Sequence, residues 1–135
     1  MIQSLDHVSD YPQPGCESLR TAIAAYEKME AEDIICGNGA AELIFSLCRA
    51  LKPGRALVPA PTFAEYEQAL ESVGCVTGYY MLQEKEDFQL SEAFLEALQP
   101  ELDLVFLCNP NNPTGILTER ELLLQILNRC REYGI

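Results

Sequence analysis

The stretch Phe106-Leu107-Cys108-Asn109-Pro110-Asn111-Asn112-Pro113-Thr114-Gly115 joins a short apolar run to a turn of unusual composition. The run 103–108 is β-prone and apolar after its first residue, which is typical of a strand covered on both faces in a parallel sheet. The prolines and Gly115 end that strand. Three asparagines then place amide donors and acceptors at its carboxyl end, where open α/β sheets bind ligands. A lone Asn-Pro pair would indicate only a tight turn, but the whole stretch favours a ligand-binding turn.

Short apolar runs alternate with helical patterns along the rest of the chain. Strands are expected at 33–36, 55–59, 75–82 and 103–108, and helices at 16–29, 40–51, 63–74, 91–98 and 118–133. Capping boxes are expected at Thr62–Glu65 and Thr118–Glu121, with Ser91 as a further N-cap. The alternation predicts a three-layer α/β/α fold, in which a parallel sheet lies between helices.

Composition and charge exclude several classes of function. The 135 residues carry a net charge of −12, from 21 acidic and 9 basic side chains, which argues against nucleic acid or an anionic membrane as a partner. At 48% hydrophobic residues, the chain can bury a core, but no apolar run reaches the length of a membrane span. Met1 leads into polar and acidic residues and not into a signal peptide, so we expect a cytoplasmic protein.

The cysteines and the single histidine do not predict a metal site or a disulfide framework. Five of the six cysteines lie inside apolar patterns, without C-x-x-C spacing, and we expect them to be small core residues: Cys36, Cys48, Cys75, Cys108 and Cys130. His7 is the only histidine, so a zinc site or a cysteine–histidine catalytic pair is not expected. We expect His7 at the surface.

A glycine turn, Gly37-Asn38-Gly39, lies between the expected strand 33–36 and the helix that begins at Ala40. Glycines let the backbone approach a ligand, and the free N–H groups and dipole of a helix start favour an anion. The signal is weak by itself, because Glu42 stands where a dinucleotide fingerprint needs its third glycine. The glycine turn, the turn at Phe63 and the turn at Asn112 all follow strands, so they should share one sheet edge and one ligand site.

Four motifs together carry a family resemblance: Tyr11-Pro12-Gln13-Pro14-Gly15, Gly37-Asn38-Gly39-Ala40-Ala41-Glu42, Pro61-Thr62-Phe63-Ala64-Glu65-Tyr66 and Asn109-Pro110-Asn111-Asn112-Pro113-Thr114-Gly115. In order and approximate spacing they resemble the fold-type I pyridoxal-phosphate enzymes of aminotransferase class I/II. The branch is that of histidinol-phosphate aminotransferase, and within it the likeness is nearest to threonine-phosphate decarboxylase. The resemblance runs from about Tyr11 to the last residue.

The resemblance implies roles for six residues toward pyridoxal 5′-phosphate. In the family, the glycine turn binds the cofactor phosphate, which implies Gly39 and the N–H groups of Ala40 and Ala41. Phe63 would stack on the pyridine ring, although an aromatic at a helix start is otherwise usually a core residue. Asn112 would donate to the ring oxygen, and the Asn112–Pro113 bond is a candidate for the cis isomer. Tyr11 would reach the cofactor phosphate of the neighbouring subunit, which implies a homodimer.

The chemistry of such an enzyme needs groups that the resemblance does not locate in these residues. The family uses a lysine to hold the cofactor aldehyde as a Schiff base, an aspartate at the ring nitrogen and an arginine for the substrate carboxylate. Lys28, Lys52 and Lys85 lie at helix ends or in a charged turn, and we expect all three to be solvated. We therefore interpret 1–15 as an N-terminal arm and 16–135 as part of a cofactor-binding large domain, inactive by itself.

Two classes of function stay open at this point. The first is part of a pyridoxal-phosphate enzyme that acts on a small, phosphorylated amino acid, either as a threonine-phosphate decarboxylase in cobalamin biosynthesis or as a histidinol-phosphate or other aminotransferase. The second is a non-catalytic nucleotide- or phosphate-binding α/β domain. In the family's strand order, the strand before the glycine turn lies far from the next three. We therefore expect the strand 33–36 to lack its partners or to pair in a non-native way.

Overall fold

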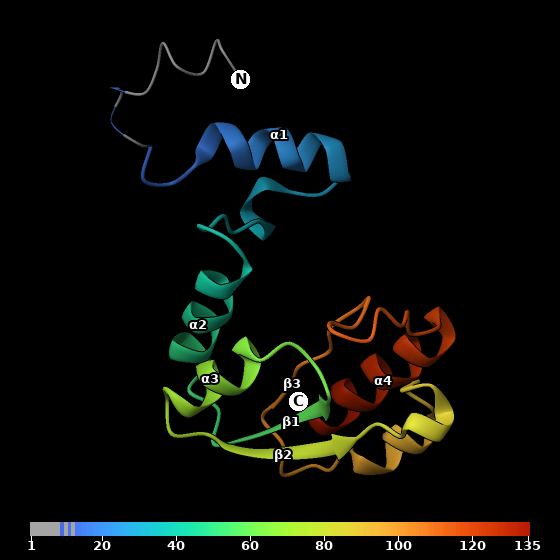
Figure 1. Cartoon of the computed structure of the whole chain (residues 1–135). Helices are drawn as coiled ribbons and strands as arrows, with labels where there is room; N and C mark the ends of the chain where they lie inside the picture. Colours follow the sequence, from blue (N-terminus) through green and yellow to red (C-terminus); the bar gives the residue numbers. More distant parts are fainter. Residues whose placement is uncertain (1–8, 10, 12) are drawn as a thin grey trace. The chain divides into compact units, whose positions relative to one another are not determined.

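The computed structural model of the chain describes residues 9, 11 and 13–135, and it divides into two compact units, Met1–Gly39 and Ala40–Ile135 (Figure 1). The first unit contains α1 (Glu17–Glu27) and a short 3-10 helix, η2 (Ala31–Asp33). His7 lies outside the described residues, so its surface position stays a prediction.

The second unit contains the remaining elements. In chain order these are α2 (Ala40–Leu51), β1 (Arg55–Ala60), α3 (Glu65–Glu71), β2 (Val76–Met81), η3 (Glu84–Glu86), η4 (Glu92–Ala97), β3 (Leu104–Val105) and α4 (Arg120–Tyr133). The three strands form a parallel sheet in the order β2-β1-β3. The expected parallel α/β architecture is therefore confirmed.

Strand β1 is the centre of this sheet. Its residues Ala56 to Pro59 are all buried, because side chains on both of its faces meet other elements. The segment 103–108, expected as the strand covered on both faces, is instead the shorter edge strand β3. Only Leu104 and Val105 pair regularly with β1, although the N–H groups of Asp103 and Phe106 extend the ladder to the carbonyls of Arg55 and Leu57.

The Asp103 carboxylate aligns the starts of β1 and β3. Its Oδ2 accepts hydrogen bonds from the N–H groups of Gly54 and Arg55 at 2.8 and 2.9 Å. These two N–H groups lie at the end of the connection from α2 to β1, before the strand ladder provides backbone acceptors for them. The side chain thus sets the register of two strands that lie about fifty residues apart in the sequence.

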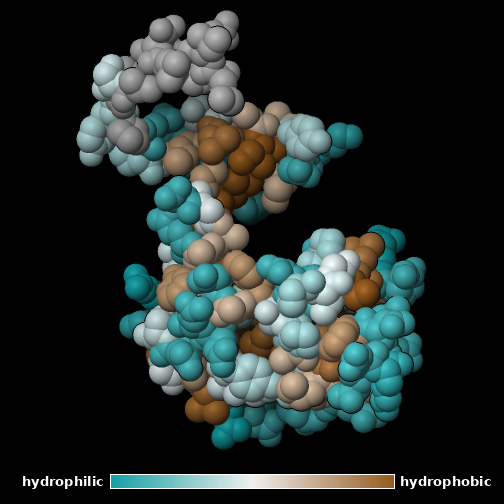
Figure 2. Space-filling model, in the orientation of Figure 1, coloured by the Kyte–Doolittle hydropathy of each residue, from teal (hydrophilic) through white to brown (hydrophobic). Residues whose placement is uncertain are grey.

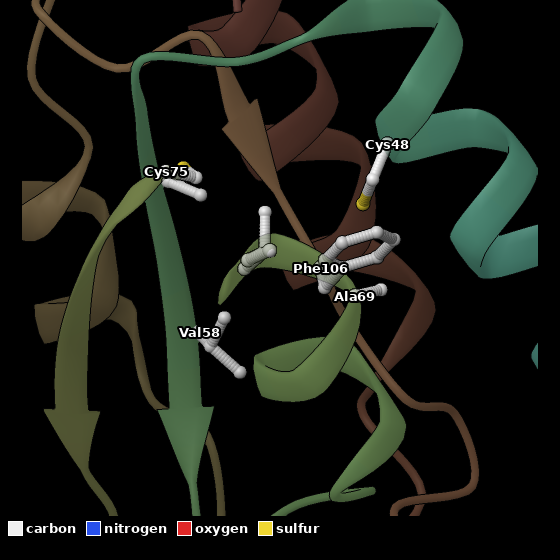
Figure 3. Close-up of a cluster of buried hydrophobic side chains, with 7 residues drawn as sticks. Cys48, Val58, Ala69, Cys75 and Phe106 are labelled. Atoms are coloured by element: carbon white, nitrogen blue, oxygen red, sulfur yellow. The ribbon is translucent and has the colours of Figure 1, made fainter. Parts of the chain in front are cut away.

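One face of the sheet packs against α2 and α3 (Figure 3). Its buried residues come from both helices, from β1 and from the ends of the neighbouring strands: Cys48, Ala56, Val58, Ala69, Leu70, Cys75 and Phe106. Figure 3 shows Cys48 of α2 turned toward the Phe106 ring. Cys48 and Cys75 are therefore core residues as predicted, whereas the other four cysteines are only half-buried; all six are free thiols.

The opposite face packs against η4 and α4, which completes the third layer. Leu57 of β1 points to this face and joins Phe94, Leu98, Leu122 and Ile126 in a second cluster. Leu127 of the same helix is 52% exposed, because α4 turns this side chain away from the cluster. The segment 91–98 forms a 3-10 helix in place of the expected α-helix, and the Ser91 side chain does not cap it.

Both predicted capping boxes are wrong. Helix α3 begins at Glu65 after Ala64, and α4 begins at Arg120 after Glu119, in each case without a side-chain cap. The Thr62 hydroxyl donates to Asn111, and the Thr118 N–H donates to the Asn109 side chain. Tertiary partners therefore take the groups that would have formed the local caps.

The first unit confirms the helix predicted at 16–29, which spans Glu17–Glu27, but this helix has no buried face. None of the residues of α1 is buried, and Leu19 and Tyr26 are 51% and 83% exposed. Apolar surface on this unit appears brown in Figure 2. Within the unit, Arg20 donates from Nε and Nη2 to the carbonyl oxygen of Ala31 at 3.0 and 2.6 Å, which ties α1 to η2.

The strand predicted at 33–36 is absent from the described sheet. Asp33 ends η2, and Ile34 has extended backbone angles but pairs with no strand of the described residues. Ile35 is 79% exposed. An extended segment becomes a strand only when a neighbour accepts its backbone hydrogen bonds, which agrees with the expectation that this segment lacks its partners.

No helix within the described part of the chain is both long and apolar enough to cross a membrane.

Candidate functional site

The turns after β1 and β3 meet at the carboxyl edge of the sheet, as the sequence predicts for these two turns. The glycine turn, expected at the same edge, follows no strand of the described sheet. Asn111, in the loop after β3, donates from Nδ2 to the carbonyl oxygen of Pro61 at 3.0 Å. Its Oδ1 accepts a hydrogen bond from the Thr62 hydroxyl at 2.7 Å. A pocket beside these turns is lined by residues 58–64 together with Glu67, Tyr79 and Pro113. The two turns therefore form one local site.

Phe63 lies in the wall of this pocket, and an aromatic series fixes its ring. The Phe63 ring meets the Tyr66 ring edge-on, with centroids 5.7 Å apart and planes at 87°. Tyr66 in turn stacks on Phe106, at 4.5 Å and 5°. These geometries are favourable for aromatic pairs. Phe63 is half-buried, so part of its ring stays available to a ligand.

Tyr66 is a structural residue in this series and not a general base. Burial raises the pKa of its phenol to about 12, and a hydrogen bond with the Cys108 side chain contributes to the rise. The phenol therefore stays protonated at neutral pH. Its position beneath Phe63 supports the ring without adding a charge to the pocket.

A tyrosine and a carboxylate lie at the rim of the same pocket. The Tyr79 hydroxyl donates to Glu67 in a short hydrogen bond. That bond raises the pKa of Tyr79 to about 12, because ionisation would place two negative charges side by side. At neutral pH, the pair carries the single negative charge of Glu67.

The loop from Asn109 to Gly115 has a folded backbone that glycine makes possible. The Gly115 N–H donates to the Asn111 carbonyl oxygen at 2.6 Å, and Gly115 adopts a φ of +74°, which side chains disfavour. The Asn112–Pro113 bond is cis, as predicted, and the Asn109–Pro110 and Ala60–Pro61 bonds are cis as well.

Two neighbouring asparagines of this loop, Asn111 and Asn112, differ in environment. Asn112, the predicted ligand residue, is exposed, and the next residue, Pro113, lines the Phe63 pocket. Asn111 is half-buried and makes the hydrogen bonds that tie the turns together. That Asn112 donates to a cofactor stays a prediction. Sequence reasoning missed the role of Asn111, and the only signal was the presence of three asparagines in one loop.

The remaining predicted residues are divided between the two units. In the first, Gly39 has a φ of +90°, and Tyr11 is 90% exposed. In the second, Ala40 and Ala41 are the first residues of α2, exposed and half-buried respectively. First-turn N–H groups of a helix have no acceptor within the helix, and the helix dipole adds partial positive charge there. The start of α2 therefore has the chemistry of an anion site.

The three lysines are solvent-exposed, as predicted. Lys28 and Lys52 follow the ends of α1 and α2, and the Nζ of Lys85 lies 3.8 Å from a carboxylate oxygen of Glu86. None of them reaches into the sheet core, so none lies in the desolvated surroundings in which lysine nucleophiles are found.

Comparison with known proteins identifies the family. Residues 3–135 match the family described as aminotransferase class I and II. The chain is 44% identical over all its 135 residues to threonine-phosphate decarboxylase of Salmonella typhimurium and covers 37% of that protein. It is 37% identical over 124 residues to histidinol-phosphate aminotransferase of Desulfitobacterium hafniense, covering 87% of this chain and 34% of the relative.

A solved structure shows the same fold. The crystal structure of L-threonine-O-3-phosphate decarboxylase from Porphyromonas gingivalis superimposes with a TM-score of 0.81 at 29% identity, over 96% of this chain and 37% of that one. The chain therefore spans little more than a third of the length of the relatives it matches. Enzymes of this family depend on pyridoxal phosphate. The chain belongs to the aminotransferase class I and II family.

Proposed function

We propose that the chain is part of the pyridoxal-phosphate-binding domain of an enzyme that decarboxylates a small phosphorylated amino acid, in the manner of threonine-phosphate decarboxylase. The observation that carries this proposal is the 44% identity to that enzyme along the entire chain. Threonine-phosphate decarboxylation belongs to cobalamin biosynthesis, and we propose the same pathway for this protein.

The predicted contact residues fit the chemistry of the cofactor. The exposed start of α2 offers the N–H groups of Ala40 and Ala41 to its phosphate, next to the glycine turn ending at Gly39. Phe63 would cover one face of the pyridine ring and exclude water from it, and Asn112 would donate to the ring oxygen. The bound cofactor supplies an electron sink for the bond that breaks.

A homodimer is part of the proposal. Tyr11 is 90% exposed, so its hydroxyl is available to the cofactor phosphate of a second subunit. Six free thiols support a reducing, cytoplasmic setting, because secreted proteins usually pair their cysteines. Light scattering of the protein that carries this chain, with Tyr11→Phe as a variant, would test the assembly and the role of the hydroxyl separately.

A second candidate function is transamination, favoured by the 37% identity to histidinol-phosphate aminotransferase. Product analysis separates the two. A decarboxylase should release carbon dioxide from O-phospho-L-threonine without an acceptor acid, whereas an aminotransferase should consume histidinol phosphate only when a 2-oxo acid is present. Because the three lysines are exposed, we expect residues 1–135 alone to do neither.

Cofactor binding tests the site directly, and Ala41→Pro is the sharpest variant. Proline removes one N–H but is tolerated in the first turn of a helix. We expect Ala41→Pro to raise the dissociation constant for pyridoxal phosphate about tenfold, by loss of a charge-assisted hydrogen bond. Ala41→Ser keeps the N–H and is the matched control. Equal affinity of both variants, or preference of the chain for a nucleotide, would contradict the proposal.

A further inference from the structure

We propose that Asn111 is a positioning residue that locks the turn bearing Phe63 to the loop bearing Asn112. This inference rests on the proposed function, since the two residues are the proposed contacts to the cofactor ring. The Asn111 side chain that joins them is half-buried between the turns and is not itself one of those contacts.

Every hydrogen-bonding group of Asn111 is engaged. Its Nδ2 donates to the Pro61 carbonyl at 3.0 Å and to the Thr114 hydroxyl at 2.9 Å, while its Oδ1 accepts from the Thr62 hydroxyl at 2.7 Å. Its main-chain N–H donates to the Ile116 carbonyl at 2.8 Å, and its own carbonyl accepts from the Gly115 N–H. A half-buried amide with this many partners has one orientation only.

The partners determine which amide atom lies where. The Pro61 carbonyl oxygen can only accept, so the amide nitrogen must face it. The oxygen is then left to accept the hydrogen bond that the Thr62 hydroxyl donates. Aspartate has the same shape but no donor, so a carboxylate at this position would face the Pro61 carbonyl without a proton to share.

The hydrogen bonds from Asn111 to Pro61 and Thr62 matter because of the backbone segments that they join. Pro61 and Thr62 directly precede Phe63, and Asn111 directly precedes Asn112, so one amide joins the backbones that carry both proposed ring contacts. The residues joined are 49 and 50 positions apart. A shift of either turn by about 1 Å would misplace a reacting ligand substantially.

Asn109 provides a matched contrast within the same loop. Its Oδ1 accepts a hydrogen bond from the Thr118 N–H at 2.8 Å, nine residues further along. This bond orders the loop before α4 but does not reach the turn after β1. Loss of either asparagine should disturb the loop, whereas only loss of Asn111 should disturb the Phe63 turn.

The experiment compares Asn111→Asp, Asn109→Asp and the unsubstituted sequence, each in the protein that carries this chain, by pyridoxal-phosphate titration and by hydrogen exchange of residues 60–66. For Asn111→Asp we expect about a tenfold rise in the dissociation constant and about tenfold faster exchange in this turn. For Asn109→Asp we expect less than about a twofold change in both. Adding Thr62→Val to Asn111→Ala should change the dissociation constant and the exchange rate little further. The Thr62 hydroxyl acts through its hydrogen bond to Asn111, which Asn111→Ala already removes.

The outcomes separate this inference from the proposed function. If the unsubstituted chain binds the cofactor and Asn111→Asp binds it equally well, the positioning role is wrong and the function stands. If the protein that carries this chain does not bind it, the proposed function fails, and the positioning role of Asn111 is judged by hydrogen exchange alone. The positioning role would be wrong in either case if Asn111→Asp left the exchange of residues 60–66 unchanged. It would also be wrong if the effects of the Thr62 and Asn111 substitutions were additive.

Discussion

Helix α1 and strand β1 are both formed by sequences rich in apolar residues, but only β1 buries them. Leu19 and Tyr26 of α1 are 51% and 83% exposed, whereas Ala56 and Val58 of β1 are 1% exposed. Strand β1 has a strand on each side and helices over each face, while α1 contacts η2 within its unit. An apolar pattern therefore determines the type of element, but its contribution to stability depends on what packs against it.

The largest expected difference between the two units comes from truncating a buried ring. Phe94 is fully buried among the residues of α4 and β1, so Phe94→Ala should lower the free energy of unfolding by about 3–5 kcal/mol. Tyr26→Ala in α1 should change it by less than about 0.5 kcal/mol. Urea denaturation followed by circular dichroism measures both, and equal losses would refute the comparison.

Thiol reactivity should separate the two units at the level of single residues. Cys48 and Cys75 are buried, and desolvation raises the pKa of both thiols, so little thiolate is present or accessible. Cys16 and Cys36 in the first unit are half-buried. At pH 8, we expect alkylation of Cys16 and Cys36 to be faster by about tenfold or more. Mass spectrometry of peptides after timed quenching gives the four rates, and similar rates would show that the core of the second unit opens readily.

Removing the hydrogen bonds that join α1 to η2 should have a smaller effect on stability, confined to the first unit. Arg20→Met keeps most of the aliphatic stem but removes both hydrogen bonds to the Ala31 carbonyl. We expect a local loss of about 1 kcal/mol, seen as faster hydrogen exchange of α1. Arg131→Met, an exposed position of α4, is the control. If α1 exchanged equally fast in both proteins, Arg20 would not hold the unit together.

The smallest effect on stability is expected from removing the Glu67 carboxylate, to which the exposed Tyr79 donates a hydrogen bond. Tyr79 has a pKa raised to about 12 by its hydrogen bond to Glu67. Because the folded-state pKa lies above the ordinary value of 10, the bond stabilises the protein below pH 10, and the stabilisation is lost between pH 10 and 12. In a spectrophotometric titration, Glu67→Gln should move the Tyr79 transition toward pH 10, with little change of stability at pH 7. An unmoved transition would contradict the assignment of the cause.

Much of the fold follows from the sequence because it depends on local patterns. The spacing of apolar residues predicts α1, α2 and α4, and the runs at 55–59 and 75–82 predict β1 and β2 within a residue or two. The strand at 33–36 was wrong for a physical reason. A strand exists only with a hydrogen-bonded neighbour, and the sequence of one segment does not contain that neighbour.

The site is predictable to the extent that its residues act locally. The helix start at Ala40 and the glycines with positive φ can be recognised from the residues themselves. The role of Thr62 cannot, because its hydroxyl donates to the amide oxygen of Asn111, forty-nine residues further along the chain. Its side chain does not cap α3, although the local sequence predicts a capping box. The roles of Phe63 and Asn112 toward a cofactor stay predictions.

The central position of β1 also has a consequence for the order of folding. Arg55 of β1 pairs with Val76 of β2, 21 positions later, whereas Ala56 pairs with Leu104 of β3, 48 positions later. Closing the longer loop costs about 0.7 kcal/mol more chain entropy. The segment β1–α3–β2 should therefore form first, and β3 and α4 should then pack onto it. Substitutions in α3 should then slow folding, whereas equally destabilising ones in α4 should chiefly speed unfolding.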